Sequence, residues 1–280
     1  MAKVKASAGF SGKIPTGSYQ NSNPSFYAEM EMDALLEGDA LMSSIDSLQK
    51  LLHNICYQNF KIVADAAHIE KLKNDRRGFR FYKTPNGDYP SVTTVLDPEF
   101  KAYCTEEELE IAIAEGNINH ARAAHYITTG EWVEPKKLDG VAPALLLLKG
   151  RIIDGWDFPA MLVKYPIQTL VNGRQLVNHE HRYAGTNDCE GLYLLGGGNG
   201  AEAVPTIMDF KRTPDRDKNF AQMAAYARCE GMEHIKQMMI VPANTETQQG
   251  FSKPILSASI DKYFEVFLHK RREFQRTYGV

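Results

Sequence analysis

The chain has 280 residues, which suits one domain of good size or a domain with an arm. Its 43% apolar and 24% charged residues are ordinary for a globular protein, which excludes wholesale disorder and a fibrous or low-complexity chain. The net charge of −3 does not by itself indicate a nucleic-acid binder.

The N-terminal quarter is expected to hold an arm and a helical part. Residues 1–27 are rich in Ser, Gly, Asn and Lys without a sustained period, which predicts a flexible arm. Apolar residues recur near helical spacing over 29–55, with an interruption near Gly38, and a second helical stretch follows over 61–74. We expect one domain over 28–280, with a helical N-terminal part (28–75) and a core over about 78–270.

A hairpin and two helices come next. Two aromatic or β-branched runs, 78–84 and 89–96, flank an Asn-Gly turn. Thr105 and Glu108 have the spacing of a capping box, which opens a helix through Tyr126. Another helix is expected over 140–156.

Beyond residue 158 the pattern turns mainly to strands. Strands are expected over 161–171, 174–181, 186–195, 203–210, 236–241 and 251–256, and helices over 218–232 and 259–278. Helices followed by a meander of strands, then a helix and a strand, predict a sheet domain of the α/β or α+β class.

Two aspartates flank the Gly-rich segment centred near residue 198. If the strands on either side pair as a hairpin, Asp188 faces Asp209 at the open end, and a bulge would shift this pairing by one residue. Asp209 and Lys211 are two residues apart on one strand and share a face, while Phe210 points toward the core. Gly196–Gly200 lacks the ending of a phosphate-binding loop and is read as a hairpin turn.

Carboxylates this close repel each other unless a cation or a proton lies between them. Oxygen ligands suit Mg²⁺ or Mn²⁺, and a Lys beside such an ion can orient or help deprotonate a water and balance phosphate charge. Two Asp and a Lys around a hard metal ion are therefore suited to phosphodiester hydrolysis.

The ordered motifs resemble the PD-(D/E)XK nuclease superfamily, specifically its RecB-like exonuclease branch, which includes phage exonucleases and mitochondrial genome-maintenance exonucleases. In chain order the matching elements are Tyr89–Leu96, Gly116-x-x-x-His120, Asp188, Asp209-Phe210-Lys211 and Gln222-x-x-x-Tyr226. The resemblance implies an α/β fold with a central mixed β-sheet flanked by helices, a restriction-endonuclease-like αβββαβ core with an N-terminal helical extension.

The resemblance also implies roles for single residues. His120, Asp188, Asp209 and the backbone carbonyl of Phe210 would hold Mg²⁺ or Mn²⁺. Lys211 would position or activate the attacking water, and Gln222 would orient water or phosphate. The branch carries one more acid before the first Asp, for which Glu180, Gln168 and Lys164 all remain candidates. Arg212 departs from relatives, which often have a small or hydroxylated residue after the Lys.

Several side chains are candidates for substrate binding, each with a structural alternative. Basic residues alternate with aromatic ones in a pattern that suits single-stranded DNA, or equally a solvated helix end before an ordinary strand; they include Arg76, Arg77 and Arg80. Ser91 and Thr93 would contact phosphate or serve as strand ends or helix caps. Tyr226 would contact substrate or pack in the core. His125 and His181 are assigned no role.

The expected function is a Mg²⁺- or Mn²⁺-dependent DNA exonuclease, acting from strand ends on single-stranded DNA in phage or bacterial replication, recombination or repair. The alternatives are a non-catalytic DNA-end-binding or recombination accessory protein and a structure-specific endonuclease of the same superfamily. Four cysteines without C-x-x-C pairing predict a reducing compartment and no iron–sulfur cluster. Without an apolar signal-peptide core or a run of the ~20 residues that span a bilayer, we expect a cytoplasmic protein (host cytoplasm if phage-encoded) with no membrane partner.

Overall fold

The computed structural model describes residues 2–11, 14–17, 20–22, 25–34, 38–75, 78–100, 103–148, 156–196, 201–243, 247 and 249–280. The chain divides into two compact units, Met1–Gly78 and Phe79–Val280. Arg76 and Arg77, two of the predicted substrate contacts, lie outside the described residues.

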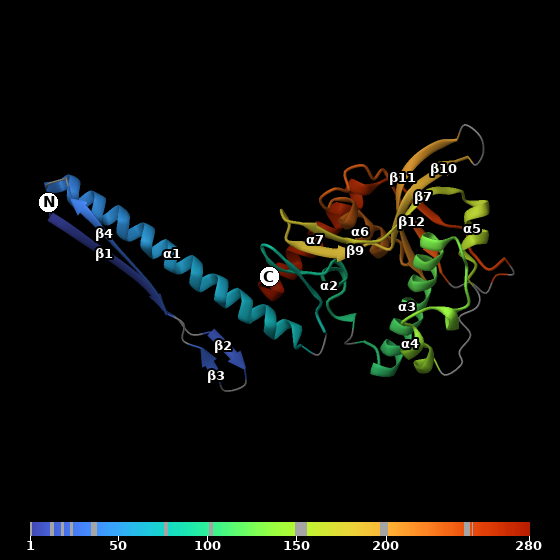
Figure 1. Ribbon diagram of the computed structural model, residues 1–280, viewed down its shortest axis with the longest axis horizontal. Helices are drawn as coiled ribbons and strands as arrows, with labels where there is room; N and C mark the ends of the chain where they lie inside the picture. The colour runs from blue at the N-terminus through green and yellow to red at the C-terminus, as the bar shows by residue number, and fades with distance from the viewer. Residues whose placement is uncertain are drawn as a thin grey trace. The chain divides into compact units, whose positions relative to one another are not determined.

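The first unit combines β-hairpins with one long helix (Figure 1). Strand β1 (Ala2–Ser11) pairs antiparallel with β4 (Ser25–Ala34), and β2 (Ile14–Gly17) pairs with β3 (Gln20–Ser22). Helix α1 runs without a break over Gly38–Lys73. Residues 1–27, expected to form a flexible arm, contain β1, β2, β3 and the start of β4; the β1–β4 pairing joins residues 14 to 32 positions apart and so gives no local helical period. The beginning of the helical stretch expected over 29–55 is instead strand β4 as far as Ala34, and residues 35–37 lie outside the described residues.

The second unit begins with a short hairpin and helices. Strands β5 (Phe81–Thr84) and β6 (Gly87–Pro90) form the predicted hairpin, but 92–96 is helix α2 (Val92–Leu96), not a strand. Ser91 is the physical reason, because its hydroxyl accepts a hydrogen bond from the Thr94 N–H and caps the helix. Helix α3 (Glu106–Thr129) begins with the predicted capping box at Thr105. A 3₁₀ helix, η2 (Pro135–Lys137), and helix α4 (Ala142–Leu147) follow.

A five-stranded mixed sheet forms the centre of this unit, in the order β13-β12-β11-β10-β7. Its strands are β7 (Ile167–Asn172), β10 (Cys189–Leu195), β11 (Glu202–Lys211), β12 (Gln237–Pro242) and β13 (Ile255–Ser257). Only β11 and β12 run parallel, and helix α6 (Arg216–Ala227) connects them as the crossover that parallel strands require. The expectation of an α/β fold with a mixed sheet and flanking helices is confirmed.

Two predicted strands have a different structure. The first half of 161–171 is helix α5 (Phe158–Lys164), which Asp157 caps through the Ala160 N–H. The segment 174–186 leaves the sheet and forms a separate hairpin of β8 (Gln175–Asn178) and β9 (Tyr183–Thr186). Helix α7 (Ile260–Tyr278) closes the unit and packs on α6, where the tilted rings of Phe220 and Tyr263 have centroids 5.1 Å apart.

Strand β11 carries Phe210 on one face of the sheet and Asp209, together with the buried Ile207, on the other. Phe210 lies in a buried cluster with Cys189, Trp156 and Ala123 of α3. Asp209 points to the opposite face, where α6 lies, and Figure 1 shows the sheet between α3 and α6. The predicted direction of Phe210 is thus confirmed. Within the described part of the chain, no helix combines the length and the apolar character needed to cross a membrane.

Candidate active site

Strands β10 and β11 bring the two aspartates together. The register pairs Cys189 with Met208 and continues through Leu195 with Glu202, so the next pair outward is Asp188 with Asp209, as predicted. The Phe210 N–H donates a hydrogen bond of 2.7 Å to Asp188 Oδ2. The Asp188 carboxylate is therefore attached to the strand that carries Asp209 and Lys211.

A close-packed turn fixes the backbone of Asp188. The Gly173 N–H donates to the Asp188 carbonyl at 2.9 Å, and the Arg174 N–H donates to Asn187 Oδ1 at 2.9 Å. A Cβ atom on Gly173 would lie 1.7 Å from the Asn187 carbonyl oxygen, so only glycine fits at this position. The connection between β7 and β8 thus fixes the backbone position of Asp188 through these two hydrogen bonds.

Asp209 is the most enclosed acid of the site, with 2% of its surface exposed. Its Oδ1 accepts hydrogen bonds from Lys211 Nζ at 2.8 Å and from Gln222 Nε2 at 3.4 Å. Among the described residues, its Oδ2 is buried and has no hydrogen-bond partner. Burial raises the pKa of Asp209 to about 7, with a further contribution from the Asp188 charge, against the opposing effect of Lys211.

Lys211 remains an ammonium in this environment. Burial by itself lowers the Lys211 pKa, but the charges of Asp209 and Asp188 outweigh it, and the pKa lies above its usual value. Gln222 also donates to the Tyr226 hydroxyl at 3.3 Å. The site therefore contains a fixed cation, two acids and an amide on one sheet face.

His120 reaches the site from α3. Its Nε2 lies 3.4 Å from Asp188 Oδ2, and its side chain is about half exposed. Gly116, one turn earlier, has open space where a Cβ atom would be, so packing does not require a glycine there. The predicted grouping thus has two direct links. His120 contacts Asp188, and the Asp188 carboxylate is bonded to the backbone of β11 next to Asp209.

One observation favours a hard divalent cation at this site, and another shows that the ligand set is incomplete. An unpartnered buried carboxylate oxygen beside a second carboxylate is what a cation would satisfy. Among the described residues, however, no three His, Cys, Asp or Glu side chains form a metal-ligating group. The groups present that could hold such a cation are the carboxylates of Asp188 and Asp209, the Phe210 carbonyl and the His120 ring.

Of the residues predicted to contact substrate, some are buried and others are exposed. Tyr226 is buried against Gly185, where a Cβ atom would come within 2.5 Å of its ring, so it packs in the core. Ser91 is buried as the cap of α2, whereas Thr93 is exposed. Arg80 lies over the Tyr82 ring at 4.9 Å from its centroid, and the Tyr82 hydroxyl lies 3.2 Å from Thr186 Oγ1, two residues before Asp188.

None of the three residues considered for the position of the additional acid lies beside the two aspartates. Glu180 is exposed in the turn between β8 and β9, and that turn is the far end of the hairpin from Asp188. Gln168 is exposed on β7, and Lys164 is exposed at the end of α5. The local spacing did not indicate that this hairpin leaves the main sheet.

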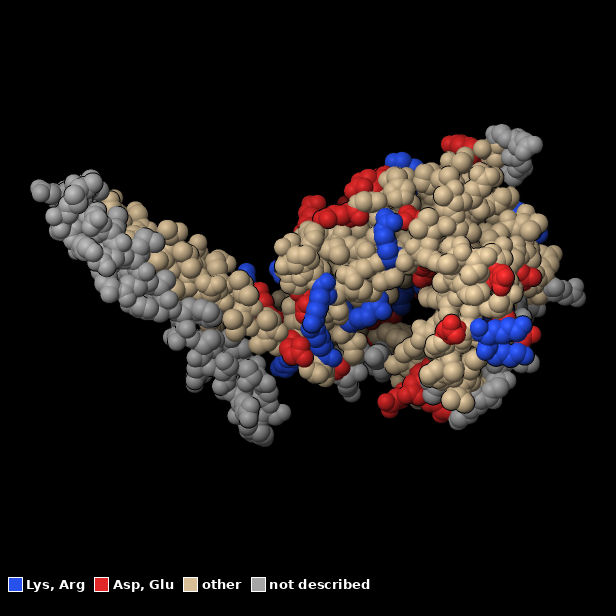
Figure 2. Space-filling view, in the orientation of Figure 1, with Lys and Arg blue, Asp and Glu red and all other residues tan. Residues whose placement is uncertain are grey.

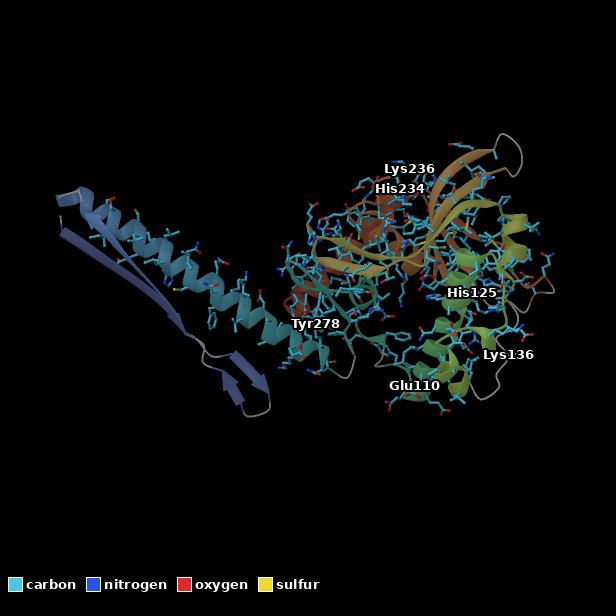
Figure 3. The ribbon with its side chains drawn as sticks, in the orientation of Figure 1. Glu110, His125, Lys136, His234, Lys236 and Tyr278 are labelled. Carbon is cyan, nitrogen blue, oxygen red and sulfur yellow. The ribbon has the colours of Figure 1, made fainter. Side chains whose placement is uncertain are left out.

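Sequence reasoning missed Glu190, a buried acid on β10. Its Oε1 pairs with Arg174 at 2.9 Å and its Oε2 with His234 at 3.0 Å, and His234 is labelled in Figure 3. Glu190 lies two residues after Asp188, so strand alternation places both on one face and was the available signal.

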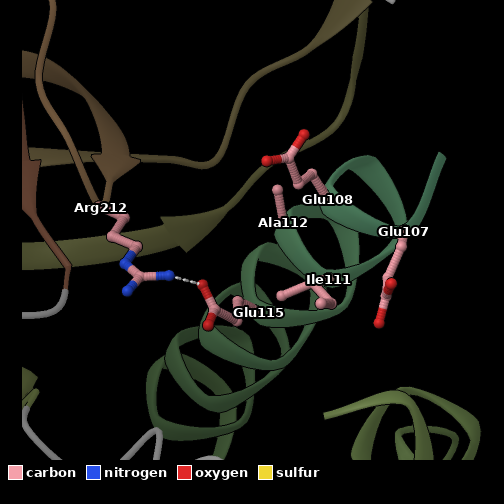
Figure 4. Close-up of a pocket in the computed structure, with 6 residues that line it drawn as sticks. All are labelled: Glu107, Glu108, Ile111, Ala112, Glu115 and Arg212. Atoms are coloured by element: carbon pink, nitrogen blue, oxygen red, sulfur yellow. Dashed lines mark hydrogen bonds and ion pairs between the residues drawn. The ribbon is translucent and has the colours of Figure 1, made fainter. Parts of the chain in front are cut away.

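Beside the site, Arg212 pairs with Glu115 of α3 across a cavity of about 430 Å³ (Figure 4). Figure 2 shows a hollow in the second unit, between the region of α2 and β9 and the region of α3 and α4, with basic and acidic side chains at its rim.

A scan against protein-family models finds no match to the chain, and no curated protein matches it significantly.

Proposed function

We propose that the protein is a Mg²⁺- or Mn²⁺-dependent deoxyribonuclease of the RecB-like PD-(D/E)XK type, an exonuclease that acts on single-stranded DNA in phage or bacterial DNA replication, recombination or repair. The observation that carries this proposal is the environment of Asp209. One of its carboxylate oxygens is bonded by Lys211 and Gln222, and the other is buried without a partner among the described residues, beside Asp188.

The order of elements supports the same proposal. Helix α3 precedes the antiparallel strands β7, β10 and β11, then come α6 and the parallel strand β12. This order agrees with the αβββαβ core that the motifs imply. The three motif elements with chemistry, around Asp188, Asp209 and Gln222, lie on consecutive elements of this core.

Each side chain has a role that its contacts support. Asp188, Asp209 and the Phe210 carbonyl, with His120, would hold the cation. The bound cation supplies Lewis acidity toward the scissile phosphate. Lys211 donates hydrogen bonds as an ammonium, so it orients the attacking water and offsets phosphate charge. Gln222 keeps Asp209 Oδ1 and the Tyr226 hydroxyl in place.

Hydrolysis needs a water oxygen to add to phosphorus while one P–O bond breaks. In such a reaction the negative charge on the phosphate oxygens is spread over the transition state, and fixed positive groups stabilise it. Lys211 is such a group, at a fixed distance of 2.8 Å from Asp209 Oδ1. Arg80 and Tyr82, near Thr186, offer a cation and an aromatic face to a strand.

The test uses one labelled single-stranded DNA oligonucleotide in linear and circular forms, with Mg²⁺, with Mn²⁺ and with chelator. Asp209→Asn is compared with Asp217→Asn, an exposed aspartate in the first turn of α6. Metal-dependent loss of the linear form only, abolished in Asp209→Asn and retained in Asp217→Asn, is expected. Cutting of the circle would make the protein an endonuclease. Binding without cutting of DNA or RNA, single or double stranded, would favour the accessory role.

A separate measurement addresses the cation. Mn²⁺ binding, followed by its paramagnetic signal, is expected to weaken in His120→Gln. The matched control is His125→Gln, five residues further along α3 and labelled in Figure 3. Equal affinities of the two variants would remove His120 from the site.

A further inference from the structure

Arg212 lies next to the proposed catalytic lysine but is turned away from it. It follows Lys211 at the end of β11, so alternation along the strand directs it to the other side. There it pairs with Glu115, whose side chain is only 13% exposed, while the Arg212 side chain is 56% exposed. Both residues line the cavity beside α3 (Figure 4).

The cavity that holds Arg212 is rich in negative charge. Glu107, Glu108 and Glu115 line it together with Arg212, and Ile111 and Ala112 complete the lining. A phosphate would be repelled by these carboxylates, so the cavity is no binding place for DNA. The guanidinium end of the pair is open to solvent, which weakens its attraction to Glu115 and leaves it free to exchange partners.

A guanidinium released from Glu115 would have a better partner in a phosphate of a bound DNA strand. It is planar, always charged and matches phosphate oxygens with two parallel hydrogen bonds. Its Cα is adjacent to that of Lys211, so its side chain is within reach of a strand whose scissile phosphate lies at Lys211.

We propose that Arg212 is a second phosphate-binding cation of the site, that Glu115 holds it aside in the DNA-free protein, and that a phosphate of the substrate strand replaces Glu115 as its partner. This inference rests on the proposed function. It makes Glu115 a competitor of the substrate. A simple brace between α3 and β11 would instead make Glu115 and Arg212 equally helpful to the site.

The two possibilities predict opposite signs for Glu115→Gln. If Glu115 competes with phosphate, removing its charge tightens DNA binding. If the pair only braces the site, Glu115→Gln and Arg212→Gln both weaken binding. The doubly substituted protein Glu115→Arg, Arg212→Glu restores an ion pair, so it keeps the brace but removes the cation from β11.

The experiment measures fluorescence anisotropy of a labelled oligothymidylate at several salt concentrations, with Ca²⁺ replacing Mg²⁺ and also in chelator. We expect Arg212→Gln to weaken binding about tenfold and to reduce the salt slope by about 0.7, the value for one single-strand phosphate contact. Glu115→Gln is expected to tighten binding several-fold, and the charge-swapped protein to bind as weakly as Arg212→Gln. Exposed controls are Arg272→Gln on α7 and Glu110→Gln on α3, the latter labelled in Figure 3.

Weaker binding by Glu115→Gln would overturn the inference, as would an unchanged affinity and salt slope in Arg212→Gln. Normal binding by the charge-swapped protein would do the same. Thermal unfolding of every variant separates these results from loss of the fold. Failure of the wild-type protein to bind any DNA in either buffer would instead overturn the proposed function, and the inference with it.

Discussion

The Phe210 N–H donates its hydrogen bond to Asp188, although Asp188 belongs to the segment that leads into the neighbouring strand. One bond therefore joins the two acids of the candidate site through the backbone between Asp209 and Lys211. The side-chain charge of Asp188 and its role as a hydrogen-bond acceptor are two separate properties, which two substitutions can distinguish.

Asp188→Asn retains an acceptor oxygen, whereas Asp188→Ala leaves the Phe210 N–H without one. We expect Asp188→Asn to fold with nearly wild-type stability but to lose cation binding. Asp188→Ala should lose cation binding and also about 1–3 kcal/mol of unfolding free energy. Urea denaturation in chelator together with Mn²⁺ titration checks both expectations. Equal stability of the two variants would show that this hydrogen bond does not stabilise the fold.

Lys211→Met removes the ammonium while keeping most of the side-chain volume. If Lys211 orients water and offsets phosphate charge, nuclease activity should fall by about 10²–10⁴-fold, with the fold retained. Lys236→Met is the control, because Lys236 (Figure 3) lies just before β12, at the opposite end of the sheet from Lys211. Activity of Lys211→Met within twofold of that of the control would exclude the role given to this lysine.

The raised pKa of Asp209 predicts how stability changes with pH in chelator. An ordinary aspartate in the unfolded chain has a pKa near 4, whereas burial raises the pKa of Asp209 to about 7. The folded state therefore binds the proton more tightly. The contribution of this carboxyl group to stability is therefore fully present below about pH 4 and is lost as pH rises from about 4 to about 7.

Asp209→Asn does not titrate, so it should become more stable than the wild-type protein, by a few kcal/mol, at pH 8 in chelator. The advantage should shrink at pH 5. Adding Mg²⁺ at pH 8 should raise the melting temperature of the wild-type protein only. A stability difference that stays constant between pH 5 and pH 8 would contradict the raised pKa.

Two glycines of the site should respond in opposite directions to the same change. Gly173→Ala places a Cβ atom 1.7 Å from a backbone oxygen, so it should destabilise the protein severely. Gly116→Ala meets no atom within 4 Å and removes a glycine from the interior of α3, so it should stabilise the protein by up to about 1 kcal/mol. Thermal unfolding measures both.

The activity of Gly116→Ala carries separate information. Loss of activity in a stabilised protein would mean that the open space beside Gly116 admits substrate. Unchanged activity would leave the glycine with no role in the site. A destabilised Gly116→Ala would mean that a Cβ atom at residue 116 does not lie in open space.

Local patterns predicted the parts of the fold that depend on neighbours in the chain. The capping box at Thr105 and the pairing of Asp188 with Asp209 followed from short spacings and from one hairpin. The direction of Phe210 followed from strand alternation. These relationships position Asp188, Asp209 and Lys211, which is why the sequence could predict that these three side chains lie together.

The rest depended on contacts between distant segments. Nothing in residues 174–186 shows that this hairpin leaves the main sheet, so Glu180 could not be separated from the site. Short helices such as α2 and α5 result from a single cap, at Ser91 and Asp157, within apolar runs that also suit strands. The Glu115–Arg212 pair joins residues almost 100 positions apart and has no local signal at all.

Strand β11 presents Phe210 to the aromatic core and Asp209 with Lys211 to the opposite face, so neighbouring residues serve the two faces of one strand. Under the proposed function, catalytic geometry and core packing are therefore not independent traits in this protein. A conservative change under the sheet, such as Phe210→Leu, would shift the backbone between the acids before it unfolded the chain. If the proposed function holds, variation among homologous proteins at the Trp156–Phe158–Phe210 cluster should be limited by reaction rate as much as by stability.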